Sequence, residues 1–300
     1  METGVLLIAG GVVAGLFGSL LGLGGGILIV PLLTLGFGLP LREAVGVSLV
    51  CVIVTSGASA AVYLERKVAN LRLGTVLELF TAVGAVVGGA IAFLLDERLL
   101  AGLFAAMLAY IAVTMLRGAA RPSEPSKPVE ADTVAPELVA PEVVARSPAG
   151  PELAAPAARA FVRAMSAGER LSGVDYQVHR LGSGAIGSVG AGILSALLGI
   201  GGGLVKVPVM HLVMGVPLRV ATATSNLMIG ITASTSAIVY LLRGGIDPYA
   251  AGPAALGVFL GASLGSRTAH RIDLRVLRLL FVAVLLYTAF EMLRRAVGAS

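Results

Sequence analysis

Leu21-Gly22-Leu23-Gly24-Gly25-Gly26 recurs as Leu198-Gly199-Ile200-Gly201-Gly202-Gly203 in this chain of 300 residues, an offset of 177 positions (201 − 24). Without a gap, the same offset aligns Pro31 with Pro208, Ser48 with Ser225, Thr55 with Thr232, Tyr63 with Tyr240, Asp96 with Asp273, and Met115-Leu116-Arg117 with Met292-Leu293-Arg294. An ungapped match over this distance indicates that the chain contains two copies of one unit.

Outward from the repeated motif, each copy contains four apolar segments. They are Val5–Gly36, Arg42–Leu64, Leu71–Leu95 and Glu97–Arg117 in the first copy, and Leu181–Val213, Leu218–Leu242, Tyr249–His270 and Leu274–Arg295 in the second. The stretch between the copies is rich in Pro, Ala and Glu, which is typical of a solvated linker. The sequence therefore predicts a repeat at 1–117, a cytoplasmic linker at 118–178 and a repeat at 179–300.

The composition indicates a membrane protein. Hydrophobic residues make up 57% of the chain and charged residues 13%, and the mean hydropathy is +0.94, which excludes a water-soluble domain. Several segments are long enough to cross a bilayer, and the absence of alternation with period two favours helices over a barrel. The net charge of +5 comes from basic residues between the apolar segments. We expect these residues to determine the membrane topology and not to bind nucleic acid. We expect an all-α integral membrane protein.

The opening segment of each copy is interrupted, because three glycines loosen the backbone and Pro31 or Pro208 cannot donate a helical hydrogen bond. If this segment crosses the membrane once, the copies are parallel, and the arginines of residues 267–278 lie opposite the basic loop at 66–72. If it is a hairpin of two half-helices, the second copy is inverted, and both basic clusters share the cytoplasmic face. We favour inverted copies, because basic residues prefer that face.

Two triple-glycine runs are the strongest candidates for a binding site. They are Gly24, Gly25 and Gly26 in the first copy and Gly201, Gly202 and Gly203 in the second. A helix that breaks inside a membrane leaves N–H groups unpaired, and the half-helix that follows directs its positive dipole end towards them. Such a place suits an anion, and paired broken helices mark the midplane site of many transporters. The alternative is that the glycines only allow close helix packing.

Lys206 follows the second run, where the first copy has Ile29. A lone cation inside the membrane is costly, so Lys206 is a candidate ligand for the anion, with snorkelling to an interface as the alternative. Further polar candidates are Ser48, Thr224, Ser225 and Asn226, with Thr55, Ser59, Thr232 and Ser236 as weaker extensions of the same lining. Hydroxyl and amide groups suit an oxyanion, although hydrogen bonds between helices explain them equally well.

Glu78 and His211 are the other ionisable residues within or beside apolar stretches. Each is a candidate for a coupled proton, with a place near the headgroups as the alternative. Coupling to H⁺ and to Na⁺ both stay open. Cys51 is the single cysteine, and we expect it to be a buried packing residue. We expect no metal, no cofactor and no enzyme activity, because no catalytic or metal-binding motif is present.

The two glycine-rich runs that end in proline, at residues 18–31 and 195–208, resemble the paired signature of the TauE/SafE family of sulfite exporters. The resemblance covers both halves and includes Ser48 and the segment Thr224-Ser225-Asn226. It implies outward transport of a sulfur-containing anion such as sulfite, or of a sulfonate or organic acid. The long Pro-rich linker departs from the family pattern.

The leading hypothesis is a secondary transporter, an exporter that works by alternating access at a midplane site between the two repeats. We expect a multi-pass protein of the cell inner (cytoplasmic) membrane whose partners are the lipid bilayer and a small anionic substrate, without nucleic acid. An anion channel and a sensor or scaffold that uses the linker are the alternatives. The identity of the anion, the coupling ion and the formation of a homo-oligomer stay open.

Overall fold

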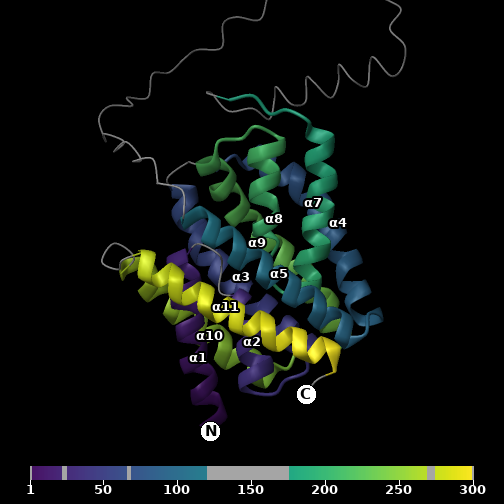
Figure 1. Ribbon diagram of the computed structural model, residues 1–300. Coiled ribbons are helices and arrows are strands. Elements are labelled where there is room, and N and C mark those ends of the chain that lie inside the picture. The colour runs from purple at the N-terminus through teal and green to yellow at the C-terminus, as the bar shows by residue number, and fades with distance from the viewer. Residues whose placement is uncertain (1, 22–25, 66–68, 120–175, 269–273, 299–300) are drawn as a thin grey trace, which may run out of the picture.

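A computed structural model describes residues 2–21, 26–65, 69–119, 176–268 and 274–298. The regular structure of these ranges is helical, as predicted (Figure 1). The first copy comprises α1 (Glu2–Leu21), α2 (Gly26–Pro31), the π-helix η1 (Leu32–Gly36), α3 (Leu41–Glu65), α4 (Leu71–Leu94) and α5 (Glu97–Ala119). The second copy comprises α7 (Leu181–Leu198), α8 (Gly203–Pro208), the π-helix η2 (Val209–Val213), α9 (Leu218–Leu242), α10 (Pro248–Thr268) and α11 (Leu274–Val297).

The helices of the two copies follow the offset of the repeated motif. α3 and α9 begin at Leu41 and Leu218, and α4 and α10 begin at Leu71 and Pro248. Each short helix α2 and α8 ends at a proline and continues as a π-helix. Because proline has no N–H to give to the preceding turn, the regular helical ladder is interrupted there and the next turn widens.

The opening segment of the second copy is a hairpin. The N–H of His179, which precedes α7, donates to the carbonyl oxygen of Met214, which follows η2, at 3.0 Å. The chain therefore returns to the end of the molecule from which α7 starts. In the first copy η1 likewise lies against α1, since a Cβ added to Gly10 would come 2.7 Å from Cδ2 of Leu32.

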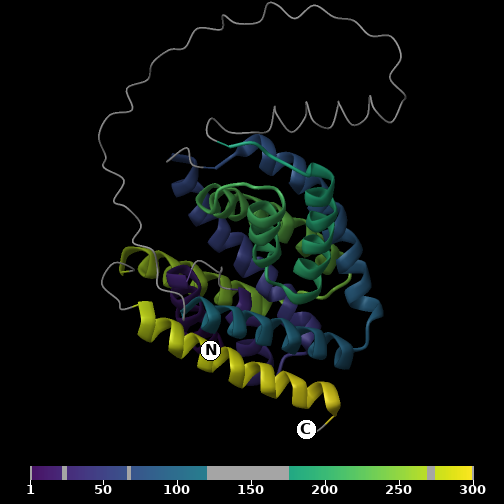
Figure 2. The same cartoon turned by 45° about the horizontal axis from the view of Figure 1, so that its top comes forward.

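The longer helices pair across the two copies. α1 packs on α10 and α4 packs on α7, so the opening helix of each copy lies against the third segment of the other. Glycines allow this approach, because a Cβ on Gly84 would lie 2.1 Å from the carbonyl oxygen of Val189, and one on Gly261 would lie 2.0 Å from that of Val12. α3 packs on α9, and α5 packs on α11, the last pair lying side by side in Figure 2.

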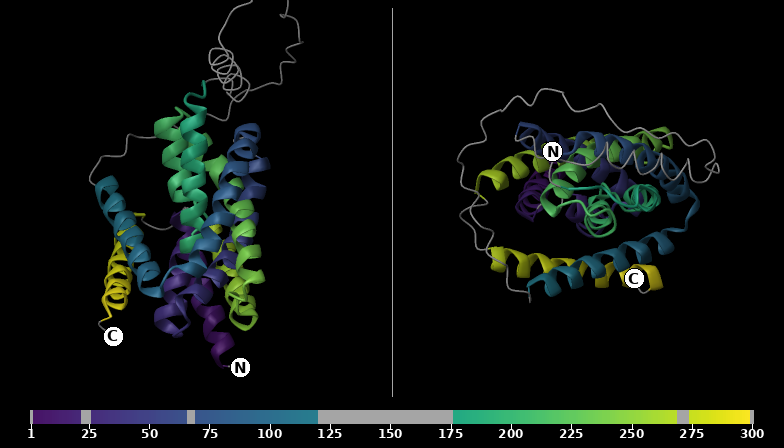
Figure 3. Two further views of the ribbon diagram at one scale, coloured as in Figure 1. Left: turned by 90° about the vertical axis from the view of Figure 1, so that its right-hand side faces the viewer. Right: turned by 90° about the horizontal axis from the view of Figure 1, so that it is seen from above.

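The two copies enter the molecule from opposite ends. The chain ends marked N and C lie at the same end, whereas α7 begins at the other end (Figure 3). α1 and α7, which occupy equivalent places in their copies, therefore run in opposite directions.

Four helical stretches in the described ranges are long and apolar enough to cross a membrane: Leu71–Leu94, Glu97–Arg117, Leu181–Leu198 and Val220–Leu242. Large apolar side chains point outward from them, including Leu79, Leu94 and Leu242. Exposed apolar surface on this scale is expected where lipid is the solvent. The structure therefore has the features of a multi-pass membrane protein.

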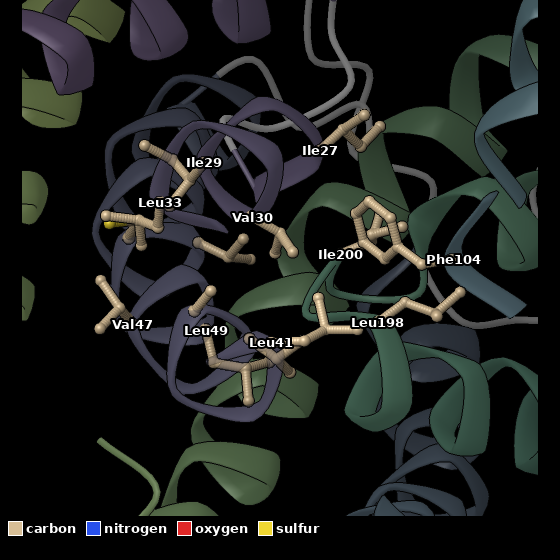
Figure 4. Packing of buried hydrophobic residues seen from close by; sticks show 14 of the residues in the cluster. Ile27, Ile29, Val30, Leu33, Leu41, Val47, Leu49, Phe104, Leu198 and Ile200 are labelled. Atoms are coloured by element: carbon tan, nitrogen blue, oxygen red, sulfur yellow. The ribbon is translucent and has the colours of Figure 1, made fainter. Parts of the chain in front are cut away.

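Buried aliphatic side chains surround the short helix α2 (Figure 4). Ile27, Ile29 and Val30 of α2 are at most 1% exposed. The same cluster contains Leu198 at the end of α7 and Ile200 in the turn that follows. This packing holds the first short helix beside the glycine turn of the second copy.

Candidate functional site

The second glycine run interrupts the helix where the sequence predicts. α7 ends at Leu198 and α8 begins at Gly203. Between them Gly199, Gly201 and Gly202 have φ angles of 68°, 79° and 74°. Residues with a Cβ rarely adopt this left-handed backbone, so glycine is needed for the chain to turn here.

The turn presents backbone donors to the interior. Among the residues that the structure describes, no backbone acceptor is bonded to the N–H groups of Gly201, Gly202 and Gly203. Further along α8, the N–H groups of Val205 and Lys206 both donate to the Gly202 carbonyl, at 3.2 and 3.1 Å. Unpaired N–H groups at the start of a helix are suited to an anion.

Gly26 of the first run packs directly against this turn. A Cβ on Gly26 would lie 2.6 Å from the carbonyl oxygen of Gly199. The buried hydroxyl of Ser48 lies 3.1 Å from the Gly26 carbonyl oxygen and 2.8 Å from that of Gly199, and it has one proton to donate to them. Ser48 thus joins the glycine segments of the two copies. Gly24 and Gly25 lie outside the described residues.

Two buried hydroxyl groups beside the turn lack hydrogen-bond partners within the described ranges, those of Ser195 and Ser225. The Ser225 hydroxyl lies 3.5 Å from a Cβ built on Gly203, and the Ser195 Cβ lies 3.3 Å from one built on Gly202. A buried hydroxyl without a partner costs about 1–3 kcal/mol, so these groups indicate a place for a ligand or a water molecule.

Sequence reasoning selected Ser225 but missed Ser195. The sequence signal for Ser195 was its hydroxyl group in an apolar segment, one helical turn before the glycine run. In the structure, the Ser195 carbonyl accepts the Gly199 N–H at 2.9 Å.

Thr224 faces the start of α4. Its Oγ1 accepts the N–H of Asn70 at 2.9 Å, and the Asn70 side chain caps α4 by accepting the N–H of Leu73 at 3.0 Å. This bond fits the alternative in which Thr224 ties helices together. Asn226 lies half-buried two residues further along α9.

Lys206, Glu78 and Thr232 meet in the interior. Lys206 Nζ lies 3.0 Å from Glu78 Oε2 and 2.5 Å from Thr232 Oγ1, and Thr232 Oγ1 lies 2.6 Å from Glu78 Oε1. Lys206 is 1% exposed, Glu78 4% and Thr232 0%, so Lys206 does not snorkel to the surface. The triad joins α4 of the first copy to α8 and α9 of the second. The sequence singled out Lys206 and Glu78 separately and gave no sign that they pair.

The place related to this triad by the repeat has no charge. The offset of 177 relates Lys206 to Ile29, Glu78 to Ala255 and Thr232 to Thr55. Ile29 is fully buried, and the hydroxyl of Thr55 donates within its own helix, to carbonyl groups of α3. The charged triad, which is shared between the two copies, therefore has no charged counterpart at the position related to it by the repeat.

The structure does not join His211 to this triad. His211 is exposed on η2, and its Nδ1 lies 2.9 Å from the carbonyl oxygen of Val216. Cys51 is a free, buried cysteine, which fits its predicted packing role. In the described part of the chain, no group of three or more His, Cys, Asp or Glu residues is placed to hold a metal ion.

Helices of membrane-spanning length, a helix broken at glycines and an internal charged pair together define a multi-pass membrane protein with a polar centre. Residues 7–292 match the family described as "Sulfite exporter TauE/SafE", so the chain belongs to this family of membrane transporters. The chain is also similar to the "Probable membrane transporter protein YunE" of Bacillus subtilis (strain 168), with 25% identity over 299 residues, 96% of this chain and 97% of that protein. No solved structure matches the chain at a significant level.

Proposed function

We propose that this transporter carries a small sulfur-containing or organic anion, such as sulfite or a sulfonate, out of the cell across the cytoplasmic membrane. The observation that carries the proposal is the glycine turn, which brings together N–H groups without a backbone acceptor among the described residues, the Ser225 hydroxyl and the start of α8, which carries Lys206. These groups are donors and a cation, and they complement the lone pairs and the charge of an oxyanion. The family description supports sulfite as the type of solute.

In the proposed complex, the N–H groups of Gly201, Gly202 and Gly203 donate to the oxygens of the anion. The hydroxyl groups of Ser225 and Ser195 gain the acceptors that they lack. Lys206 supplies the compensating charge, because an anion without a counter-charge is strongly disfavoured in a buried site.

We further infer that the two copies are inverted repeats that work by alternating access. The opposite directions of α1 and α7 support this arrangement, as does the exchange of partners by which α1 packs on α10 and α4 on α7. Two halves with equivalent folds and opposite orientations can exchange conformations, which opens the same site first to one side of the membrane and then to the other.

The burial of the site favours a transporter over a channel. Ser195, Ser225 and Lys206 are each 1% exposed. A channel needs a continuous pore past its selectivity groups, whereas an occluded site is a normal stage of alternating access.

Transport in proteoliposomes tests the proposal. With sulfite, thiosulfate and small sulfonates we expect saturable uptake and counterflow, and we expect Lys206→Ala to reduce uptake about tenfold to a hundredfold, since it removes a charge-assisted hydrogen bond of about 1.5–3 kcal/mol. Protein-free liposomes are the control for leakage. Equal uptake by the native chain and the variant would remove Lys206 from the site, and unsaturable flux without counterflow would indicate a channel.

A further inference from the structure

Glu78 faces one charged group, Lys206, in the part of the chain that the structure describes. The other ionisable residues on the elements packed around it are Arg72 on α4, His211 on η2, and Arg219 and Tyr240 on α9. Arg72 and His211 are exposed, the Arg219 side chain lies outside the described part, and the Tyr240 hydroxyl donates to a carbonyl group of α7 at 2.9 Å. α7 itself contributes no titratable side chain. The charge of Glu78 is therefore balanced by Lys206.

The neutrality of this pair decides which ions can enter together. A singly charged anion that binds Lys206 while Glu78 is ionised leaves one negative charge without a partner in a buried site, which is strongly unfavourable. If Glu78 first takes up a proton, Lys206 is the uncompensated charge, and the anion restores neutrality. The proton and the anion thus favour each other's binding.

We propose that Glu78 is the proton-carrying residue of this transporter, and that its protonation releases Lys206 to hold the anion, so that one proton moves with each anion. This inference rests on the proposed function. In the step, the proton adds to a carboxylate oxygen of Glu78, the ion pair with Lys206 breaks, and the anion takes the place of the carboxylate beside the Lys206 ammonium group. The net charge of the site stays at zero before and after.

Thr232 is placed to stabilise both states of Glu78. Its Oγ1 lies 2.6 Å from Glu78 Oε1 and 3.0 Å from the carbonyl oxygen of Met228. In the ionised state the Thr232 proton points to Glu78. In the protonated state that proton turns to Met228, and Thr232 accepts the new proton of Glu78, so the oxygen that carries the proton keeps its partner after the ion pair with Lys206 breaks.

The geometry favours H⁺ over Na⁺ as the coupled ion. A hard metal cation needs several oxygen ligands, and both carboxylate oxygens of Glu78 are already bonded, one to an ammonium group and one to a hydroxyl. A second cation beside Lys206 would be repelled. A proton needs only one oxygen and the hydroxyl that Thr232 already provides.

Lys206 is anchored beside the proposed anion site. Its backbone N–H donates to the carbonyl group of Gly202, so its side chain begins one turn from the N–H groups of Gly201 to Gly203. Two of the three ammonium protons are used by Glu78 and Thr232. In the proposed step, this side chain rotates and moves the ammonium group from the carboxylate to the turn.

Proton movement with methanesulfonate tests the inference on the native chain. Methanesulfonate is the anion of a strong acid and stays singly charged at working pH, so it carries no proton of its own. In proteoliposomes with an enclosed pH indicator and a clamped membrane potential, we expect acidification of the interior as the anion enters, one proton per anion. We also expect the affinity for the anion to fall about tenfold for each pH unit above the midpoint of titration.

Glu78→Gln is the decisive variant, because glutamine keeps the shape of the side chain but takes up no proton. We expect it to bind methanesulfonate with an affinity that does not change with pH and to move the anion without acidification. Continued proton movement in this variant would overturn the inference.

A matched pair of threonine variants separates the switch from a merely structural ion pair, even if Glu78→Gln fails to fold. Thr232→Val removes a hydrogen bond that is stronger to the ionised carboxylate than to the protonated carboxyl group, so it should raise the midpoint of the affinity curve by about one pH unit. Thr55→Val changes the equivalent threonine of the first copy and should leave the midpoint in place. Equal midpoints for both variants and the native chain would overturn the role of the triad.

The native assay also distinguishes the two proposals. Transport of the anion without any proton refutes the inference and leaves the proposed function standing. Absence of flux for sulfite, thiosulfate and all tested sulfonates refutes the proposed function itself.

Discussion

At the level of single residues, the two copies differ most in chemistry at Lys206 of the second copy and Glu78 of the first, whose counterparts in the other copy are Ile29 and Ala255. The backbone of both places is built from equivalent helices, so the charges are not required by the fold. A buried ion pair seldom adds stability compared with apolar residues of similar volume. This difference supports a role for the pair in transport.

A stability comparison tests whether the pair acts as a unit. Lys206→Ile leaves Glu78 in an apolar interior without its cation, and we expect a lower thermal midpoint in detergent, equivalent to a loss of about 3 kcal/mol. Lys206→Ile combined with Glu78→Ala introduces the residues found at the counterpart positions 29 and 255 and should regain part of this loss. A double variant less stable than Lys206→Ile alone would show that the two residues are not coupled in this way.

At the level of elements, glycines decide how closely the helices approach. The contact between α4 and α7 depends on Gly84, where a Cβ would meet the Val189 carbonyl oxygen. Not every glycine lies at such a contact. Gly190 on α7 has no atom within 4 Å of an added Cβ. Gly261 on α10 makes the corresponding contact with α1, where a Cβ would meet the Val12 carbonyl oxygen.

Alanine at two glycines of this helix pair should have opposite effects. Gly84→Ala overpacks the contact, and we expect a destabilisation of about 1–3 kcal/mol. Gly190→Ala meets open space and should stabilise α7 by up to about 1 kcal/mol, because alanine is the better helix former. Thermal unfolding in detergent, followed by circular dichroism, measures both. If the two variants have the same thermal midpoint, the close approach of α4 and α7 does not depend on the absence of a Cβ at Gly84.

At the level of the whole molecule, the hairpin of each opening segment determines the number of crossings. In the proposed inverted arrangement, the hairpin brings the chain back to its starting side, and α3, α4 and α5 then add three crossings to the first copy. The second copy then starts from the opposite side, which agrees with the common end of the chain termini in Figure 3.

Reporter fusions test this topology. A reporter fused after Ser300 should read as external, and one inserted after Ala119, at the end of α5, should read as cytoplasmic. The physical reason is the preference of the basic residues at 66–72 and 267–278 for the cytoplasmic face. A cytoplasmic reading after Ser300 would contradict the inverted arrangement and favour parallel copies.

The sequence alone determined the features that depend on local chemistry. The helices follow from long apolar segments, and the break follows from Gly201 and Gly202, because glycine and proline act on their own backbone whatever surrounds them. The duplicated unit followed from a comparison of the chain with itself.

The tertiary structure alone decided which distant groups meet. Lys206 and Glu78 are separated by 128 positions in the chain, and nothing in either segment encodes their contact. That contact depends on the exchange of partners between α1, α4, α7 and α10 and on α8 folding back from the glycine turn. Ser195 was missed for the same reason, since its hydroxyl acquires a role only when a separate helix element turns towards it. Pairings of this kind arise from the packing of all helices together, and no local pattern of residues specifies them.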